Sequence, residues 1–416
     1  MGASVDQFEV GGASLWPARR LDGEIAGSIE GLRSTLESAE AEGERLRHLP
    51  QAAVDALASA GLFKVSLPRG LGGWEADVLL ELEVFEAMAR ISTAACWNVI
   101  VGNFHSSIPA VFCSDEAVKQ IFLGSRFPVV AGQPASIGKG RPADGGMVVS
   151  GRYGWGSGIA HAGWVIGGCT METDGQLPPE RRAWVAPKEA VHVIDNWQVA
   201  GLMATGSSDY TVEDLFIPDG WWFPFGDPGP LTQDTPLVAP NPRRGGNKYH
   251  AVTRVWPMSG HIGLLLGAAE HALECIADLA SRKRRRNAAT SVAAREVFRH
   301  DLGANFVLLS ATRDNAVRLF SQVADLTAAG EPVRRELVHQ IYGLSAHTAR
   351  TATAVAQMAY SYAGGDSVRL DNPLQRILRD LLVAQQHLLY SDTQFESLGE
   401  MLVQRASDAS RPAGAL

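Results

Sequence analysis

The chain has 416 residues, 46% hydrophobic and 20% charged, which is typical of a globular protein long enough for two or three domains. Its formal net charge of −8 argues against a nucleic-acid partner, because phosphate binding needs a broad basic face. No apolar run approaches the roughly 18 residues of a membrane helix. We therefore expect a cytoplasmic protein that binds neither nucleic acid nor membrane.

Taken in order, the chain divides into three predicted domains. Residues 20–127 show apolar residues at helical spacing and predict an N-terminal α-helical domain. Residues 128–240 contain short β-like runs between Gly, Pro and Asp, which favour a small antiparallel barrel or sandwich. Residues 241–416 predict a C-terminal four-helix bundle, with helices near 263–281, 292–327, 332–363 and 373–404.

The most distinctive stretch is 151–164, which follows an alternating apolar run typical of a strand. Glycines on both sides of Ser157 allow a flat ligand to approach the backbone, and Trp155 and Trp164 offer rigid faces for it. The Ser157 hydroxyl is then the one polar group in an apolar slot. The alternative is that glycine and tryptophan simply form a corner of the β-sheet.

Several common sites are absent from the sequence. There is no Gly-x-Gly-x-x-Gly after a strand, no Walker loop, no Gly-x-Ser-x-Gly and no His-Glu-x-x-His. Gly260 and Gly263 lie inside a helical pattern and are interpreted as packing glycines. The four cysteines are scattered and predict buried thiols rather than a disulfide or metal site. A basic run starts at Arg282; it is either a solvated face or a phosphate clamp.

The block order resembles the acyl-CoA dehydrogenase fold, which is α+β but mostly α. Three separated stretches carry the resemblance, namely 60–73, 201–218 and 364–380. Most dehydrogenases of that superfamily remove an α-proton with a glutamate that lies about eight residues beyond an Arg-Asp pair. Leu388 stands about there after Arg379-Asp380, and leucine cannot take a proton. Some members carry this base on another helix.

The remaining motifs resemble the two-component flavin-dependent monooxygenases of the same superfamily. These share Gly-Gly-x-x-Val-Ser-Gly, Trp-x-Ser-Gly, a His and a Trp, Thr-Gly-Ser, and Arg-Asp followed by a His. The chain has all of them, ending with His387. The resemblance implies reduced FMN or FAD delivered by a separate NAD(P)H:flavin reductase, O2 as co-substrate, and a homotetramer. It also implies hydroxylation of a small, aromatic or phenolic substrate through a C4a-hydroperoxyflavin.

The same resemblance assigns roles to particular residues. Ser157 would hold the flavin N5 and protect the oxygen adduct from water, and His387 would act as the base for a phenolic substrate. His105 lies in an otherwise apolar helix and is a second catalytic candidate, since a buried imidazole needs a partner or a cavity. Flavin-binding candidates are Trp155, Ser157, Gly158, Thr205, Ser207 and Arg282, and no metal ligand is expected.

Alternatives stay open at this point. His387 can also belong to a wet helix face that it shares with Arg376 and Asp380. Thr205 and Ser207 can simply shape a turn, and His161 fits a structural role better than a chemical one. For the whole chain, the alternatives are an acyl-CoA dehydrogenase or oxidase with a displaced base, an N-oxygenase of an amino sugar, and a flavin-free binding protein.

Overall fold

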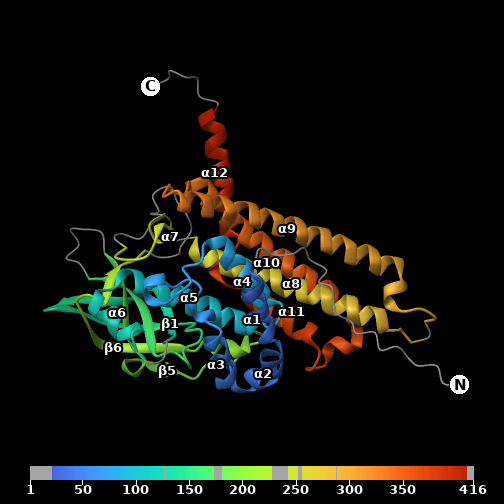
Figure 1. Cartoon of the computed structure of the whole chain (residues 1–416), viewed down its shortest axis with the longest axis horizontal. Helices are drawn as coiled ribbons and strands as arrows, with labels where there is room; N and C mark the ends of the chain where they lie inside the picture. Colours follow the sequence, from blue (N-terminus) through green and yellow to red (C-terminus); the bar gives the residue numbers. More distant parts are fainter. Residues whose placement is uncertain are drawn as a thin grey trace.

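The computed structural model describes residues 21–124, 128–172, 180–226, 242–251, 255–286 and 288–409. The β-sheet lies at one end of the molecule, and the long C-terminal helices extend from it toward the other end (Figure 1). The predicted domain boundaries at 127/128 and 240/241 fall outside the described residues or at their edge, and they stay predictions. Most of the segment between the sheet and the bundle is likewise outside them.

The N-terminal part is helical. Its elements are α1 (Gly23–Gly31), α2 (Arg33–Leu46), α3 (Gln51–Ser59), η1 (Leu62–Lys64), η2 (Arg69–Leu71), α4 (Val78–Ala89), α5 (Thr93–Phe112) and α6 (Asp115–Phe122). Side-chain caps begin the central helices: the Asp77 carboxylate accepts the amides of Leu79 and Leu80, and Ser92 Oγ accepts the amide of Ala95. Nearly every residue of α5 is buried, so this helix contacts other elements on all its faces.

One seven-stranded sheet follows, with the order β5-β6-β2-β1-β3-β4-β7. The strands are β1 (Val130–Ala143), β2 (Gly146–Tyr153), β3 (Trp164–Met171), β4 (Arg181–Pro187), β5 (His192–Ile194), β6 (Asp209–Pro218) and β7 (Trp222–Pro224), with short helices η3 (Lys188–Ala190) and η4 (Met203–Thr205). The expected antiparallel pairing is wrong for one pair, since β1 and β3 are parallel. After β2 reverses direction, the turn 154–163 carries the chain to the far side of β1.

The C-terminal part consists of α7 (Asn247–Ala251), α8 (Trp256–Arg282), η5 (Val292–Ala294), α9 (Glu296–Ala328), α10 (Arg335–Ala363), η6 (Gly364–Val368), α11 (Pro373–Ala384), η7 (Leu388–Tyr390) and α12 (Thr393–Ala409). The single helix expected over 373–404 is wrong. Helix α11 ends at Ala384, and the His387 side chain then accepts the amide of Leu389 and begins η7. His387 therefore lies in a break between helices rather than on a helix face.

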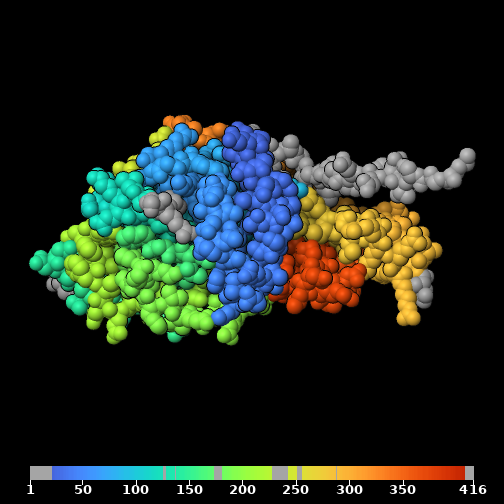
Figure 2. Space-filling model, turned by 60° about the horizontal axis from the view of Figure 1, so that its bottom comes forward, coloured from blue at the N-terminus to red at the C-terminus, as the bar shows by residue number. Residues whose placement is uncertain are grey.

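The two helical parts share one hydrophobic core. Helices α4 and α8 approach so closely that a Cβ added at Gly263 would lie 2.5 Å from the carbonyl oxygen of Leu82, and one at Gly267 would lie 2.1 Å from that of Glu86. The interpretation of Gly263 as a packing glycine is thus confirmed. In Figure 2 the N-terminal helices (blue) lie between the sheet (green) and the orange-red segment around α11.

Candidate functional site

Two loops of the β part run side by side and bring three hydroxyl groups together. The turn 154–163 after β2 and the segment around η4 are joined by a hydrogen bond from the Gly158 amide to the Thr205 carbonyl (2.8 Å). The side chains of Ser157, Thr205 and Ser207 are all buried there. The sequence placed these residues in separate motifs, and the structure makes them neighbours.

The three hydroxyls form a chain whose direction is fixed at one end. Thr205 donates to the Leu202 carbonyl (2.8 Å), which commits its only proton. The contact between Ser207 and Thr205 (2.6 Å) must then be donated by Ser207, and the contact between Ser157 and Ser207 (2.7 Å) by Ser157. Ser157 Oγ also accepts the indole N–H of Trp97 (3.1 Å). One lone pair of Ser157 Oγ therefore remains open to a further donor.

Trp97, on α5, connects the hydroxyl chain to a cluster of imidazoles. Its ring makes edge contacts with His261 of α8 (centroids 5.2 Å apart) and with His387 (5.6 Å). The rings of His261 and His387 are stacked, with centroids 5.0 Å apart and planes inclined by 25°. Tyr390 closes the cluster, because its hydroxyl lies 2.7 Å from Nδ1 of His261.

Burial keeps these imidazoles neutral at pH 7. It lowers the pKa of His387 to about 4 and that of His105 to about 3, where the neighbouring His387 adds a smaller effect. It also lowers the pKa of His261 well below its usual value, with further contributions from His387 and His105. Nδ1 of His105 has no hydrogen-bond partner among the described residues. The cluster thus offers neutral, partly unpaired imidazole nitrogens.

The remaining predicted residues lie apart from this cluster. Trp155 has a positive φ of 56° and is 67% exposed, so one face of its indole is open. Trp164 stacks on Trp221 (centroids 5.1 Å apart), so that ring face is taken. Arg282 pairs with Asp278 at the C-terminal end of α8. With a rise of roughly 1.5 Å per residue, it lies about 30 Å along the helix from His261.

Sequence reasoning missed three residues of the site: Trp97, His261 and Tyr390. Trp97 lies in the apolar helical run that carries His105, and His261 lies between Gly260 and Gly263, which were interpreted as packing glycines. A usable signal was the spacing of eight residues between Trp97 and His105, which places both near one side of a helix. No comparable local pattern marks His261 or Tyr390, which meet only in the folded chain.

The Arg379-Asp380 pair holds the β part against α11. Asp380 accepts the amide of Leu202 (2.6 Å), and Arg379 donates to the Ala200 carbonyl (2.9 Å) and to Glu44 (2.6 Å). Asp380 is buried, and the loss of its hydration raises its pKa to about 7, with a smaller contribution from the charge of Glu40. This pair therefore fixes the loop that carries Thr205.

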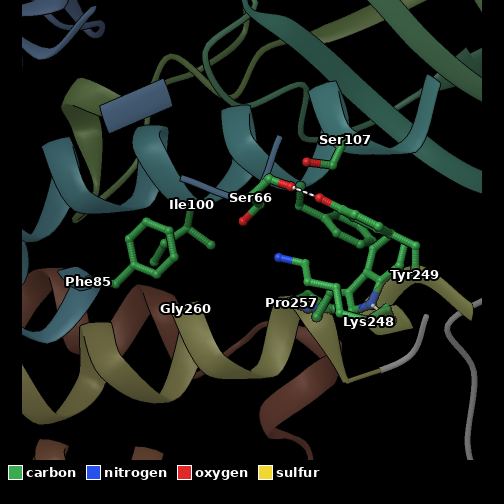
Figure 3. A pocket seen from close by; sticks show the side chains of 10 residues that line it. Ser66, Phe85, Ile100, Ser107, Lys248, Tyr249, Pro257 and Gly260 are labelled. Carbon is green, nitrogen blue, oxygen red and sulfur yellow. Dashed lines mark hydrogen bonds between the residues drawn. The ribbon is translucent and has the colours of Figure 1, made fainter. Parts of the chain in front are cut away.

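A small pocket lies between α5 and α8 (Figure 3), and its lining includes the chain neighbours of His105 and His261. It has a volume of about 10 Å³, enough for one water molecule, and its lining includes Phe104 of α5 and Gly260 of α8. The Lys248 ammonium points into this pocket (Figure 3) and pairs with the buried Glu81 carboxylate (2.7 Å). The volume excludes an aromatic ring from this pocket.

Comparisons with known proteins show which proteins this chain resembles. Residues 259–392 match the family model "Acyl-CoA dehydrogenase, C-terminal domain". An indole-3-acetate monooxygenase of Pseudomonas putida is 25% identical over 360 residues, covering 86% of this chain and 88% of the relative. The oxygenase subunit HsaA, a flavin-dependent monooxygenase of Rhodococcus jostii, is 30% identical over 190 residues, covering 46% of this chain and 49% of the relative.

The solved structures match over almost the whole chain. XiaF from a Streptomyces species, determined in complex with FADH2 and glycerol, superposes with a TM-score of 0.80 at 21% identity and covers 92% of this chain and 95% of its own. The chain has the fold of the acyl-CoA dehydrogenases and is a flavin-dependent monooxygenase. Its cofactor is reduced flavin.

Several features are absent from the described residues. No carboxylate there contacts the imidazole cluster, and Leu388 is 45% exposed beside it. No group of three or more His, Cys, Asp or Glu in the same residues is placed to hold a metal ion. None of the helices in the described part of the chain has the length and apolar character needed to cross a membrane. Cys96, Cys113 and Cys169 are buried, unpaired thiols, and Cys275 is unpaired and half-buried.

Proposed function

We propose that this monooxygenase is the oxygenase component of a two-component system that hydroxylates a small aromatic substrate. A separate NAD(P)H:flavin reductase would supply reduced FMN or FAD. The bound flavin gives two electrons to O2, so that one oxygen atom enters the substrate and the other leaves as water. The absence of a nicotinamide fingerprint in the sequence and the name of the HsaA relative, an oxygenase subunit, support this division of labour.

The hydroxyl chain suits the reduced flavin ring. Because Ser157 donates to Ser207 and accepts from Trp97, its open lone pair can receive an N–H, which the reduced ring carries at N5. Gly158 has a positive φ of 76°, and a Cβ there would lie 3.1 Å from Oδ1 of Asn98, so this position favours glycine beside a flat ligand. The open face of Trp155 is available for stacking. Thr205 and Ser207 would act by orienting Ser157.

The imidazole cluster suits the substrate. His387 is neutral at pH 7 and can take a proton from a phenol or from a similar acid. To accept the substrate proton at Nε2, His387 must first shift its own ring proton from Nε2 to Nδ1. This breaks the hydrogen bond from the Leu389 amide to Nδ1. Because that hydrogen bond is long (3.3 Å) and weak, its loss costs little. His105 would orient the substrate through its unpaired Nδ1. Trp97 separates this side from the hydroxyl chain.

The observation that carries this proposal is that Ser157 and His387 both contact the indole of Trp97. Among the described residues, no carboxylate lies beside these two side chains. A thioester dehydrogenase needs a carboxylate there, so the displaced-base alternative loses support. An amino sugar presents many hydroxyls, whereas the partners found here are a few neutral imidazoles and an indole. The aromatic substrate therefore fits better.

We further propose that the protein works as a homotetramer. Within one chain Arg282 lies about 30 Å along α8 from His261, so we expect a phosphate-binding role for Arg282 to involve a second copy. Leu402 and Val403 of α12 and Val307 of α9 are exposed apolar residues available for such contacts. The cytoplasmic location stays a prediction.

Rapid mixing tests the proposed function. The protein is mixed with reduced FMN or FAD and O2 in the presence of indole-3-acetate or 4-methylphenol, and hydroxylated product and hydrogen peroxide are quantified. We expect product from the wild type, more hydrogen peroxide per flavin oxidised in Ser157→Ala, and loss of product in His387→Ala with flavin oxidation retained. Failure to bind either redox state of flavin at tens of micromolar would make the protein a flavin-free binding protein. Turnover of acyl-CoA with an artificial electron acceptor would instead favour a dehydrogenase.

A further inference from the structure

The contact between Tyr390 of η7 and His261 of α8 has no part in the roles assigned so far. The Tyr390 hydroxyl lies 2.7 Å from Nδ1 of His261, and both side chains are buried. Burial raises the pKa of Tyr390 well above its usual value and lowers that of His261 well below its own. At pH 7 the phenol keeps its proton and the imidazole is neutral, so the contact contains either the phenol O–H or one imidazole N–H as its donor.

The geometry identifies the donor. The only other acceptor within reach of the Tyr390 hydroxyl in the described chain is the backbone carbonyl of His261, at 3.5 Å. That distance is beyond a normal O–H···O hydrogen bond, whereas 2.7 Å to Nδ1 is close to ideal. The Tyr390 O–H therefore donates to Nδ1. A neutral imidazole that accepts at Nδ1 carries its proton on Nε2.

The Nε2–H of His261 is then a donor without a partner among the described residues. His387 cannot accept it, because the two rings are stacked and a stacked ring does not direct its lone pair at its neighbour. Trp97 has no acceptor nitrogen and contacts His261 only through its ring. Because the His261 side chain is only 5% exposed, this open N–H is better placed to donate to a bound ligand atom than to bulk solvent.

We propose that Tyr390 holds His261 in its Nε2–H form so that His261 donates a hydrogen bond to an oxygen atom on the aromatic substrate, beside His387. This inference rests on the proposed function and extends it. His261 is then a substrate-binding residue, and Tyr390 is a positioning residue that never touches the substrate. The consequence is a preference for aromatic compounds that carry a phenol or carbonyl oxygen over compounds of the same shape that lack it.

The first test uses the protein without flavin. Nitrogen-15 NMR of selectively labelled histidine, with the His261 signals assigned by their loss in His261→Gln, reports which ring nitrogen carries the proton. We expect Nε2–H in the wild type and a mixture of both forms in Tyr390→Phe. A His261 ring protonated on Nδ1 in the wild type would overturn the inference, whatever the protein does with flavin.

The second test separates the two nitrogens by substitution. Glutamine places an amide near the position of Nε2 and keeps a donor there, whereas asparagine reaches only the position of Nδ1 and can still accept from Tyr390. The probes are 4-methylphenol and 1,4-dimethylbenzene, which differ only by hydroxyl against methyl. For 4-methylphenol, we expect His261→Asn to raise Kd about tenfold, which corresponds to roughly 1.4 kcal/mol. His261→Gln should change it by less than about threefold, and neither variant should change the Kd of 1,4-dimethylbenzene.

The outcomes distinguish this inference from the proposed function. Equal Kd values of both probes for the wild type, or equal losses in the Asn and Gln variants, would refute the donor role of His261. A change in flavin affinity in His261→Asn with unchanged 4-methylphenol affinity would place the donor at the flavin and would also refute it. A wild type that binds neither oxidised nor reduced flavin would refute the proposed function alone, since the NMR experiment and the probe titrations are both done without flavin.

Discussion

The hydrogen bond between Trp97 and Ser157 leads to a prediction about stability. Ser157→Ala removes the acceptor of the buried Trp97 N–H and leaves that donor without a partner, at a cost of about 1 to 3 kcal/mol. Trp97→Phe removes the donor instead and leaves Ser157 with its bond to Ser207 (2.7 Å) intact. Besides the packing of the larger ring, it loses only one hydrogen bond, worth about 1 kcal/mol.

The double variant removes both partners and leaves no unpaired donor. We therefore expect Ser157→Ala combined with Trp97→Phe to be less destabilising than the sum of the two single changes, with a coupling energy of about 1 kcal/mol or more. The assay is urea unfolding of the four proteins, followed by tryptophan fluorescence and circular dichroism. Ser38→Ala on the exposed face of α2, combined with Trp97→Phe, is the matched control and should be additive. Additivity within about 0.3 kcal/mol for the Ser157 cycle would show that the indole does not hold the hydroxyl chain.

Three further predictions concern the elements around the site. Between about pH 4 and pH 7 the folded protein holds a proton on Asp380 that the unfolded chain releases, so this group makes stability fall as pH rises, by at most about 1.4 kcal/mol per pH unit. The buried histidines act in the opposite sense, so the quantity to measure by urea unfolding is the difference between wild type and Asp380→Asn; a difference that does not vary with pH would contradict the buried acid. Gly201→Ala places a Cβ 2.2 Å from the Arg379 carbonyl oxygen and should lower the Tm by several degrees, whereas Gly27→Ala, with nothing within 4 Å, should leave it unchanged or raise it; equal Tm values for both variants would rule out the close approach. Lys248→Met should destabilise the protein by about 3 to 5 kcal/mol in urea unfolding, because it leaves the Glu81 carboxylate buried without its partner, and Glu81→Gln in the same chain should recover part of this loss. No recovery in that pair would mean that the packing of the lysine stem, not the charge, carries the effect.

The sequence predicted the structural features that depend on residues close together in the chain. Apolar residues at helical or alternating spacing, broken by glycine and proline, depend only on near neighbours, and the α+β, mostly α architecture followed from them together with the family resemblance. The structure brings Ser157, Thr205 and Ser207 together and shows the direction of their hydrogen bonds, while their role at a flavin stays a prediction.

The errors arose where a tertiary contact overrides a local pattern. Leucines continue at helical spacing past Ala384, yet the chain leaves the helix there because the His387 side chain accepts a backbone amide and begins η7. Trp97 and His261 lie within apolar helices, where a polar atom with a buried partner looks the same in sequence as ordinary core. The parallel pairing of β1 and β3 depends on which side of β1 the turn 154–163 crosses, and strand patterns carry no information on that choice.

Leu202 explains why the hydroxyl chain and the imidazole cluster keep a fixed relation although their residues are far apart in the sequence. Its amide donates to Asp380 of α11, and its carbonyl accepts from Thr205, the first member of the hydroxyl chain. From Thr205 the hydrogen bonds continue through Ser207 to Ser157 and Trp97, whose ring contacts His387.

His387 follows Asp380 along the same segment, so the connections form a closed ring. A shift of α11 would therefore move Asp380 and His387 together. Through Leu202 it would also reorient the Ser157 hydroxyl, although α11 does not contact Ser157. Since Asn keeps an oxygen acceptor for the Leu202 amide and Ala does not, Asp380→Asn should keep the yield of hydroxylated product per flavin, whereas Asp380→Ala should release more hydrogen peroxide. Equal yields from the two variants would show that the ring is not needed to hold Ser157.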